Sequence, residues 1–383
     1  MAVLVLAEKP SVARDIAKVL GASTRTDAAF RGNGYVVTWA MGHLVALAEP
    51  HQMAPELKHW NMRDLPILPR EWPLVVLPET ADHFEKVKAL LLDPSVEEVV
   101  CATDAGREGE LIFRYCYRLA GADKPVKRLW ISSLTPEAIR EGFAGLRPSS
   151  DFDALAAAAE ARSRADWLVG MNLSRAYSLR FGPKLLSVGR VQTPTLAMLV
   201  ERERAIASFV PEDYCEVIAT FGAGADSYEA TWFDPAVLDQ RKAERLPADA
   251  ERAKAVRDRC LHRPGVVVSC SGAERSLPPP LLYDLTELQR HANRLYGLTA
   301  KDTLAVAQSL YEKHKLLTYP RTDSRHIPGD VAANLGRVVA EIAPYYGQLV
   351  AEGSGERPLS RRFCDDSKVS DHHAILPTGV RRA

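Results

Sequence analysis

Hydrophobic and polar positions in the N-terminal third of the chain follow two patterns in turn. Residues 3–6 are all apolar, and a short apolar run that ends at charged residues predicts a buried strand. Apolar residues then return with the spacing of one helix face, at Val12, Ile16, Val19 and Leu20. A proline at position 10 suits the first turn of that helix. The stretch therefore predicts a strand, a loop and a helix in succession.

The same succession recurs up to about residue 148. Its further predicted elements are strands at 35–39, 97–103 and 128–132, a helix from residue 111 onward and a helix at 135–143. Strands that alternate with helices favour a mainly parallel sheet. Ligands bind at the carboxyl ends of the strands in such sheets. Glu8, Lys9 and Asp104 fall at these positions.

The rest of the chain predicts helical and β-rich segments. The helices are expected at 153–179, 194–205, 284–296, 300–315 and 330–343. The β-rich stretches are expected at 214–232 and 265–271, on either side of a charged, proline-interrupted excursion at 233–258. Residues 278–280 are three prolines and predict a stiff connector. A chain of 383 residues with these segments predicts two to four domains.

Acidic residues gather in the loops that end two of the predicted strands. Asp104 and Glu108 share a face if the chain stays extended after residue 103, and they are also neighbours if it turns helical. In either case we expect the two carboxylates to converge, with Glu8 joining them from the neighbouring strand. Carboxylates are the hard oxygen ligands that Mg²⁺ prefers. The alternative is a solvated acidic loop that stabilises the start of a helix.

One tyrosine stands in a setting that suits nucleophilic chemistry. Tyr319 follows an apolar approach and precedes Pro320, which disfavours a helix for the residue before it and so predicts a loop or turn. A phenol has an ordinary pKa of about 10 and becomes an effective nucleophile when a positive field stabilises its phenolate. Arg321 could supply that field and bind a phosphate. The alternative is a half-buried loop tyrosine beside a solvated pair of Arg321 and Asp323.

Basic and polar side chains form a candidate track for phosphate groups. Arg162 and Asp166 lie one helical turn apart, a spacing that fits either such a track or an ordinary ion pair. Arg190 and Gln192 supply donors beside Gly189, where the chain predicts the start of a helix. That arrangement fits either a phosphate site or a plain capped helix.

The histidines offer one further candidate. His43 fits a structural role in a turn. His372 and His373 would point to opposite faces of one strand, which makes them poor joint ligands of a metal. One histidine near a phosphate is the better functional interpretation.

Composition narrows the classes of protein. The 49 basic and 49 acidic residues balance, so any surface for nucleic acid must be local. The six cysteines form no C-x-x-C pair, which argues against a zinc ribbon and a redox dithiol and favours reduced, mostly buried thiols in a cytosolic protein. No apolar run reaches membrane-spanning length, and the N-terminus enters a strand without a basic leader.

Ordered sequence windows make the chain resemble a type IA DNA topoisomerase, closest to the topoisomerase III branch. Five windows carry the resemblance, at 7–11, 104–114, 161–172, 187–196 and 310–324, and 278–293 and 371–378 add support. The resemblance implies a multi-domain α/β plus α+β protein. Its parts would be a Rossmann-like TOPRIM domain at 1–150, a helical DNA-binding segment at 151–211, the first half of a β-rich arch at 212–277 and a helical domain with the catalytic tyrosine at 278–383.

The resemblance also implies a mechanism. Tyr319 would attack a phosphodiester of single-stranded DNA and take the 5′ phosphate, while Arg321 would stabilise charge on the phosphate and Lys9 would assist at the leaving oxygen. Mg²⁺ on Glu8, Asp104 and Glu108 would position the 3′ hydroxyl for religation, and Glu8 would also take part in catalysis. No ATP is required, because the phosphotyrosine stores the bond energy. The chain contains no P-loop, which agrees.

Substrate and partners follow from the same resemblance. The family positions that contact or organise DNA near the break are matched by Arg162, Asp166, Ser187, Arg190, Gln192 and His372. We expect single-stranded and negatively supercoiled DNA as substrates, a helicase or single-strand-binding protein as a partner, no membrane, and a cytoplasmic location at the bacterial nucleoid.

Two departures from the family pattern bear on these expectations. Gly106 stands where the family has a second acidic-loop aspartate, which removes one carboxylate and leaves the number of bound metals open. The chain stops at Ala383, before the returning segments of two family domains, so we interpret it as a fragment or truncated product. Domains that lack their second half are expected to expose apolar faces.

Two other functions compete with a strand-passing topoisomerase. The first is a TOPRIM nuclease or primase-like protein, which the windows around Tyr319 and Arg190 disfavour. The second is a DNA-binding remnant whose catalysis is impaired. We predict that cleavage chemistry survives while strand passage is lost, so robust relaxation of a supercoiled plasmid by this chain would contradict that expectation.

Overall fold

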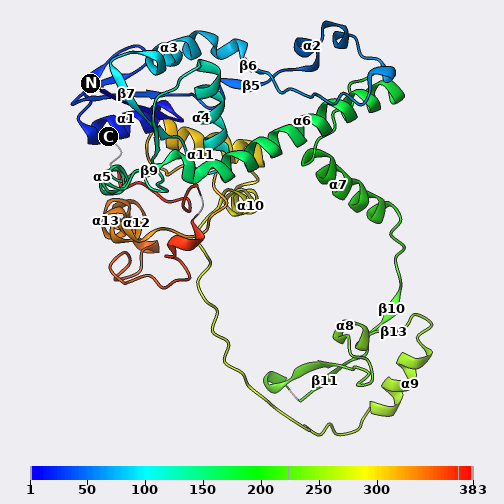
Figure 1. Cartoon of the computed structure of the whole chain (residues 1–383). Helices are drawn as coiled ribbons and strands as arrows, with labels where there is room; N and C mark the ends of the chain where they lie inside the picture. The colour runs from blue at the N-terminus through cyan, green and yellow to red at the C-terminus, as the bar shows by residue number, and fades with distance from the viewer. Residues whose placement is uncertain (1, 223, 370, 381–383) are drawn as a thin grey trace. The chain divides into compact units, whose positions relative to one another are not determined.

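The computed structural model describes residues 2–222, 224–369 and 371–380. These described residues divide into two compact units, which we call unit one (Met1–Arg190 and Pro279–Ala383) and unit two (Val191–Pro278). Figure 1 shows the order of the elements along the chain. Ser370, which directly precedes the C-terminal window of the sequence, lies outside the described residues.

Unit one is built on a mixed sheet. Within the described residues the sheet has seven strands in the order β2-β3-β4-β1-β7-β8-β9. Their bounds are Ala2–Ala7 for β1, Thr24–Arg25 for β2, Phe30–Gly32 for β3, Tyr35–Trp39 for β4, Val96–Ala102 for β7, Val126–Arg128 for β8 and Arg147–Pro148 for β9. β4, β1, β7 and β8 run parallel, whereas β2, β3 and β9 pair antiparallel at the margins. The prediction of a mainly parallel sheet therefore holds for the four central strands, while the strands at the margins are antiparallel.

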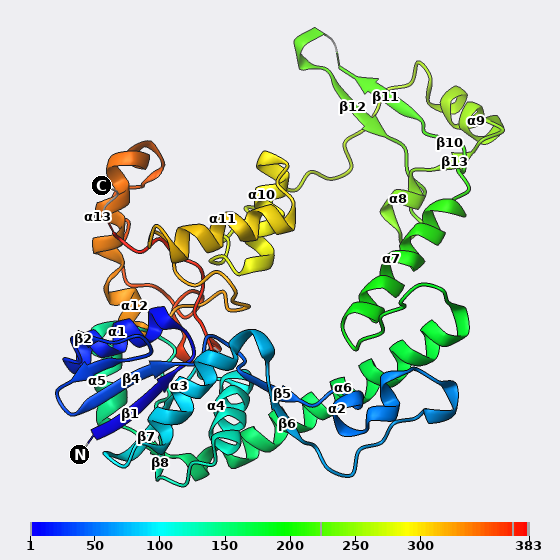
Figure 2. The ribbon, with the colours of Figure 1, turned by 90° about the horizontal axis from the view of Figure 1, so that it is seen from above.

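Helices cover both faces of this sheet, as Figure 2 shows. Because side chains alternate along a strand, Leu4 and Leu6 face one core while Val5 and Ala7 face the other. The first core contains side chains of α3 (Ala81–Leu92) and α4 (Arg107–Ala120), and the second contains side chains of α1 (Pro10–Leu20) and α5 (Pro136–Ala144). Both cores hold the carboxyl ends of β1 and β7 in fixed positions.

One predicted strand of the sheet is shorter than expected. The sequence predicts a strand at 128–132, but β8 ends at Arg128. Its parallel partner β7 ends at Ala102, and the last paired residues are Cys101 and Arg128. Among the described strands, none pairs with the chain beyond that point to extend the ladder.

Helix α6 (Asp153–Phe181) contacts the long segment between β4 and α3, which we call the excursion. The excursion contains the paired strands β5 (Val45–Leu47) and β6 (Leu74–Val76) and the short helix α2 (Pro50–Met53). The Trp167 indole donates to the carbonyl of Ala48 at 2.9 Å, and Asn172 exchanges hydrogen bonds with the backbone of Ile67 at 2.6 and 3.0 Å. These bonds hold the excursion against α6.

The C-terminal part of unit one is helical and carries the tyrosine window. Its helices are α10 (Leu285–Tyr296), α11 (Ala300–Glu312), α12 (Gly329–Ala333) and α13 (Leu335–Tyr346). Asp284 and Thr299 cap α10 and α11, because each side chain accepts a hydrogen bond from a backbone N–H of the first turn. The single helix predicted at 330–343 is two helices that meet at Asn334.

Unit two contains helices and short strands. They are α7 (Gln192–Ala207), β10 (Tyr214–Cys215), β11 (Ile218–Phe221), β12 (Tyr228–Thr231), α8 (Gln240–Ala243), β13 (Leu246–Pro247) and α9 (Glu251–Cys260). The 233–258 excursion is therefore structured, and its Leu246, Ala253 and Val256 form a small core with Trp232.

The β-rich prediction for 265–271 is wrong. These residues form no strand, and Val266, Val267 and Val268 are 83%, 71% and 94% exposed. None of the described strands pairs with them, and β propensity has no effect without a partner strand.

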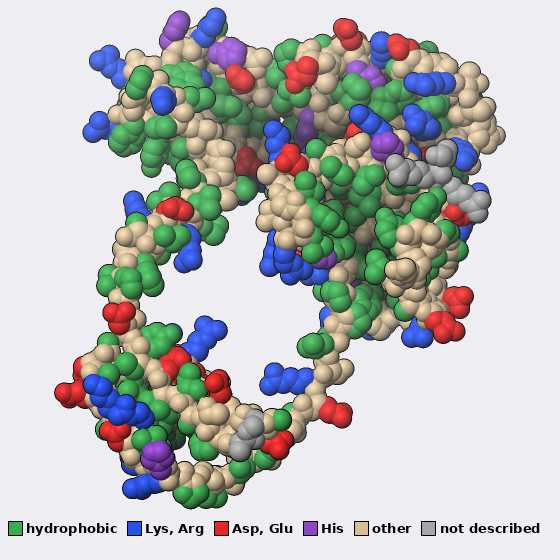
Figure 3. Space-filling model, turned by 180° about the vertical axis from the view of Figure 1, so that it is seen from behind, with side chains coloured by type: hydrophobic (Ala, Val, Ile, Leu, Met, Phe, Trp, Pro, Cys, Tyr) green, Lys and Arg blue, Asp and Glu red, His purple; other side chains and the backbone are tan. Residues whose placement is uncertain are grey.

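Apolar side chains reach the surface in both units, as the space-filling view in Figure 3 shows. No residue of α7 is buried. The expected exposure of apolar faces is thus present in this helix. The thiols also differ from expectation, because Cys101 and Cys116 are buried but Cys260 and Cys270 are exposed. Within the described residues, no helix is both long and apolar enough to span a membrane.

Candidate active site

The carboxyl ends of β1 and β7 bring two carboxylates and a lysine together. These strands are parallel neighbours, so the loops that follow them leave the sheet side by side. The backbone N–H of Asp104 donates to Glu8 Oε2 at 3.3 Å. Lys9 Nζ lies 2.7 Å from Asp104 Oδ2 and 3.3 Å from Glu8 Oε1. The convergence predicted for Glu8 and Asp104 is confirmed.

Burial and charge shape the ionisation of this group. Burial raises the pKa of the Glu8 carboxyl above its usual value, and the charge of Asp104 adds to the effect while Lys9 opposes it. Burial also acts to raise the pKa of Asp104, but a hydrogen bond from His372 and the charge of Lys9 hold that pKa well below its usual range. Burial acts to lower the pKa of Lys9, yet the two carboxylates outweigh it and raise that pKa. The Lys9 ammonium is therefore a fixed positive charge.

A buried arginine holds the acidic loop in place. Arg128 is 0% exposed, and its Nη1 and Nη2 donate to the carbonyls of Thr103 and Asp104, both at 2.7 Å. Its Nε donates to Glu110 Oε2 at 3.0 Å, and Glu110 is 1% exposed. Arg114 Nε donates to the other Glu110 oxygen at 2.9 Å. These bonds fix the backbone at Thr103 and Asp104, where the acidic loop begins.

The tyrosine segment is held by hydrogen bonds to the last described stretch of the chain. The backbone N–H of Thr318 donates to the carbonyl of Leu376, and the N–H of Leu376 donates to Thr318 Oγ1, both at 2.8 Å. Thr322 Oγ1 donates to the carbonyl of His372 at 3.0 Å. Tyr319 lies between these anchors, outside any helix or strand, as Pro320 predicts.

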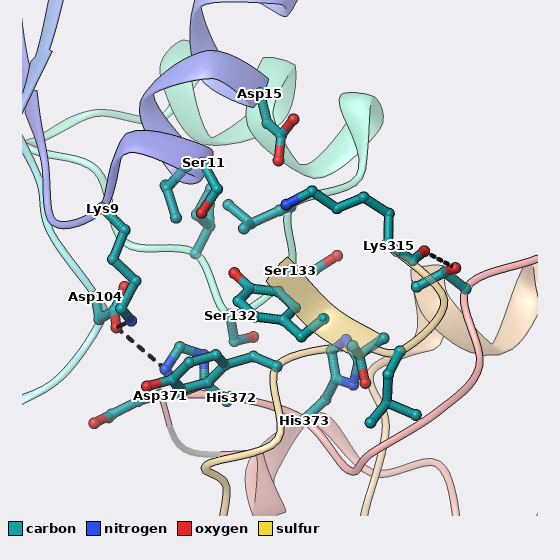
Figure 4. A pocket seen from close by; sticks show the side chains of 18 of the residues that line it. Lys9, Ser11, Asp15, Asp104, Ser132, Ser133, Lys315, Asp371, His372 and His373 are labelled. Atoms are coloured by element: carbon teal, nitrogen blue, oxygen red, sulfur yellow. Dashed lines mark hydrogen bonds and ion pairs between the residues drawn. The ribbon is translucent and has the colours of Figure 1, made fainter. Parts of the chain in front are cut away.

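The Tyr319 ring meets the acidic loop in a cavity of about 410 Å³. Lys9 Nζ lies over the ring, 4.2 Å from its centroid. The rings of His372 and Tyr311 have their centroids 4.4 and 5.3 Å from that of Tyr319. His372 Nε2 also lies 3.2 Å from Asp104 Oδ2. Figure 4 shows Lys9, Asp104 and His372 at one wall of this cavity.

Arg321 faces a second, wider cavity beside the first. This cavity has a volume of about 910 Å³, and Glu108, Arg162, Arg321 and His372 are among its lining residues. Trp130 also lines it, with a side chain 40% exposed that stacks on Phe152. The cavity thus combines cations with an exposed aromatic ring.

Glu108 does not join the other two carboxylates. Its Oε1 lies 2.6 Å from His43 Nε2, and its side chain is 59% exposed. The prediction that Asp104 and Glu108 converge is wrong for this structure, because α4 begins at Arg107 and carries Glu108 toward His43, while Asp104 stays before the helix. Within the described residues, no three His, Cys, Asp or Glu side chains form a group that could hold a metal ion.

The other predicted DNA-contacting residues lie outside the tyrosine cavity. Asp166 accepts hydrogen bonds from Arg190, one at 3.0 Å from Nη2 and one from Nε, and its Oδ2 lies 3.9 Å from Arg162 Nε. These three form one exposed ion-pair cluster, so Arg162 and Asp166 make the ion pair that their helical spacing allows. Ser187 and Gln192 are exposed, and Gln192 belongs to unit two.

Several residues of the site were not singled out from the sequence as functional. They are Arg128, Tyr311, Asp371 and His43, the last of which was expected to be structural. Asp371 lines both cavities. The feature of the sequence that could have pointed to Asp371 was its position immediately before His372. The partners of the others lie far away in the sequence, as with His43 and Glu108, which are 65 residues apart.

Family models match both parts of the chain. The model described as DNA topoisomerase matches residues 150–383, and the model of the Toprim domain matches residues 3–134. The Toprim domain is a divalent-metal-binding domain. These matches confirm the fold class expected from the sequence windows.

Similar proteins carry related names. The chain is 45% identical over 377 residues to DNA topoisomerase 3 of Shouchella clausii (strain KSM-K16) and 43% identical over 385 residues to DNA topoisomerase 3 of Bacillus cereus (strain ATCC 14579). Each match covers 98% of this chain and 50% of the relative, so the chain spans about half the length of these relatives. Full-length topoisomerase I from Thermotoga maritima matches in structure, with a TM-score of 0.62, 25% identity, and coverage of 98% of this chain and 55% of that one.

Proposed function

Because this chain belongs to the DNA topoisomerase family, we propose that it cuts one strand of DNA transiently, with Tyr319 as the nucleophile. The observation that carries the proposal is the meeting of the Tyr319 ring with Lys9 and with the pair formed by Asp104 and His372. Lys9 and Asp104 come from the N-terminal part of the chain, Tyr319 and His372 come from the C-terminal part, and all four line this cavity.

The proposed reaction is a phosphoryl transfer without net hydrolysis. The Tyr319 Oη attacks the scissile phosphorus, a P–Oη bond forms and the P–O3′ bond breaks. The phenol loses its proton, and the departing 3′ oxygen gains one to become a hydroxyl. The 5′ phosphate stays on the tyrosine, so attack by the 3′ hydroxyl reverses the step and rejoins the strand without ATP.

Cations around the ring supply the electrostatic stabilisation. The Lys9 ammonium over the ring would stabilise the negative charge that develops on the attacking and leaving oxygens during the transfer. Its raised pKa suits a fixed charge rather than a proton donor. We assign to Arg321, two residues after the nucleophile, the binding of a phosphate oxygen of the cut strand, because a guanidinium matches that geometry. Asp104 and Thr322 orient His372, which we place beside the DNA backbone.

The acidic residues fit a divalent cation in their chemistry. Glu8 and Asp104 are hard oxygen donors that already share one cation, the Lys9 ammonium, and the raised pKa of Glu8 reflects burial next to a second negative charge. We propose Glu8 and Asp104 as the residues that hold Mg²⁺, and Glu108 joins them only when it leaves its contact with His43. When bound, the ion would position the 3′ hydroxyl for rejoining.

We propose that a single strand of DNA lies along the wider cavity. Arg162 and Arg321 bring positive charge to the phosphates, and the exposed ring of Trp130 offers a surface on which a base stacks. We propose that Asp166, Ser187, Arg190 and Gln192 organise the strand further from the break. For the whole protein we propose relaxation of negatively supercoiled DNA in the bacterial cytoplasm, at the nucleoid, with a helicase or single-strand-binding protein as a partner.

An end-labelled oligonucleotide tests this function. The purified chain is mixed with single-stranded DNA and Mg²⁺, and the reaction is stopped with denaturant. We expect a label at the 3′ end of the DNA to remain on the protein, because it lies on the fragment whose 5′ phosphate is bound. A label at the 5′ end should be released. Retention of the 5′ label alone, or of neither label by a folded chain, contradicts the proposal.

Lys9 offers a second test. Lys9→Met is expected to slow adduct formation about 10²- to 10³-fold, because it removes the positive charge over the Tyr319 ring. The rate is measured by sampling the trapped adduct over time. Lys18→Met is the matched control, since Lys18 is exposed at the end of α1 and should react at the wild-type rate. Equal rates for the two variants would rule out the role of Lys9.

A further inference from the structure

The helical part of unit one that carries Tyr319 meets the sheet without a shared apolar core. The two buried apolar clusters on the faces of the sheet contain no residue beyond Ala159. Cavities of about 410 and 640 Å³ lie at this junction, and residues of both parts line each cavity. Because no buried apolar cluster of the described residues spans the junction, the placement of the two parts depends on individual polar contacts.

One hydrogen bond crosses this junction away from the reacting groups. Thr135 Oγ1 donates to Asp330 Oδ2 at 3.0 Å, although the two residues are 195 positions apart in the sequence. Both residues are half-buried, and neither lines the cavity around Tyr319. Thr135 is the N-cap of α5 and Asp330 lies in the first turn of α12, and Figures 1 and 2 show these two helices side by side. A hydrogen bond to a carboxylate is among the stronger ones in proteins.

On the sheet side, close packing connects this bond to Lys9. The Thr135 hydroxyl also accepts from the N–H of Ala138 at 3.2 Å, which fixes it at the start of α5. Ile139 of α5 is 0% exposed and shares a buried cluster with Val12 of α1. Lys9 is the N-cap of α1. Because buried side chains transmit displacements, the position of Thr135 is tied to that of the ammonium group in the tyrosine cavity.

On the other side, backbone hydrogen bonds connect Asp330 to the tyrosine cavity. The carbonyl of His326, four residues before Asp330, accepts from the N–H of Ala374 at 2.9 Å. Ala374 is 0% exposed and lies two residues after His372. The carbonyl of His372 in turn accepts from Thr322 Oγ1 at 3.0 Å. The segment with Asp330 is therefore held in one piece with His372 and with the tyrosine window.

We propose that Thr135 and Asp330 are positioning residues, whose hydrogen bond docks the helical part on the sheet and so brings Tyr319 to Lys9. For its effect on the reaction this inference rests on the proposed function, in which Tyr319 is the nucleophile. The docking itself is measured without DNA. Without the bond, the contacts inside the site would hold the two parts over a wider range of positions. A displacement of about 1 Å between reacting groups slows a reaction by up to roughly 10²-fold.

The environment of the Tyr319 ring tests this docking without DNA. The full chain is labelled with 3-fluorotyrosine, and the fluorine resonance of Tyr319 is the one that disappears in Tyr319→Phe. We expect Asp330→Ala to shift or broaden that resonance, because the ring would no longer keep its fixed place beside Lys9 and His372. Asp330→Ala leaves the Thr135 cap of α5 intact, so a change in the resonance reports on the junction.

Two further variants separate the bond from charge and shape. Asp330→Asn keeps an oxygen that accepts from Thr135, so its Tyr319 resonance should match that of the wild type. Glu137→Ala is the matched control, because Glu137 lines the same cavity of about 640 Å³ but bonds to Arg140 on its own helix. It should leave the resonance unchanged.

The rate at which trapped adduct forms gives the effect on the reaction. With saturating single-stranded DNA, we expect Asp330→Ala to form the adduct about 10-fold more slowly, while its affinity for DNA stays unchanged. Thr135→Val should react as slowly. The double variant should be no slower than the slower single variant, because both changes remove the same bond. Thr135→Ser keeps the hydroxyl and should react at the wild-type rate.

The outcomes separate this inference from the proposed function. A wild-type Tyr319 resonance in both Asp330→Ala and Thr135→Val overturns the docking role, as does an equal shift in Asp330→Ala and Asp330→Asn. A wild-type rate of adduct formation in Asp330→Ala overturns the positioning role. If the resonance shifts in Asp330→Ala but the wild-type chain forms no adduct, the docking contact stands and the proposed function fails. Thr135→Val decides the matter if Asp330→Ala proves unstable in a thermal melt.

Discussion

Tyr319→Phe is expected to abolish the covalent attachment of the protein to DNA. The variant removes one oxygen, which is the atom proposed to attack the phosphorus, and leaves the ring contacts with Lys9, Tyr311 and His372 in place. No other group on the ring can form the phosphoryl bond, so the loss should be complete within the detection limit of the assay. The measurement is the amount of 3′-labelled oligonucleotide retained on denatured protein.

Tyr311→Phe is the matched control for this experiment. Tyr311 lines the same cavity, and its ring centroid lies 5.3 Å from that of Tyr319. Its hydroxyl is therefore the nearest competing phenol among these contacts. We expect Tyr311→Phe to retain the adduct. An adduct that persists in Tyr319→Phe and disappears in Tyr311→Phe would show that Tyr311, and not Tyr319, is the nucleophile.

Arg128→Ala is expected to destabilise unit one severely. The change leaves Glu110, 1% exposed, with Arg114 as its remaining ion-pair partner within the described residues, and it removes the donors to the carbonyls of Thr103 and Asp104. Breaking a buried pair from one side costs about 3–5 kcal/mol, because the remaining charge stays buried. For a unit of this size the melting temperature should fall by roughly 6 to 20 °C.

Two further variants test the reason for that loss. Arg114→Ala removes the more exposed partner of Glu110 and should lower the melting temperature much less. Arg128→Met combined with Glu110→Met removes both buried charges and should recover part of the stability. If Arg128→Ala and Arg114→Ala melt at the same temperature, the buried pair does not hold the acidic loop.

The local elements were predictable because their causes are local. Apolar spacing predicts β1, α1 and β7, and these elements lie where the spacing puts them. The carboxyl ends of parallel neighbours meet at one edge of the sheet, so the proximity of Glu8 and Asp104 followed from the predicted topology alone. Pro320 likewise predicted a loop for Tyr319 from its effect on the preceding residue.

The remaining features depend on contacts between distant parts of the chain. The pairing of Glu108 with His43 depends on where α4 begins, because the sequence predicts the helix from residue 111 onward, whereas α4 begins at Arg107 and includes Glu108. The β-branched run at Val266 to Val268 had the composition of a strand, but it has no partner strand among the described elements. The sequence shows Gly106 only as a position without a carboxylate. It could not show that a Cβ at this position would meet the Asp371 carboxylate, because Asp371 is 265 residues away.

Mass spectrometry of the trapped adduct tests the central claim most directly. After nuclease and trypsin digestion, the account predicts a nucleotide on the peptide of residues 316–321, which contains Tyr319 and ends at Arg321. Tyr311 lies in a different tryptic peptide, residues 302–313, so the two assignments cannot be confused. A nucleotide joined through its 5′ phosphate to the first peptide supports the account. A nucleotide on the second peptide, or a link through a 3′ phosphate, would contradict it.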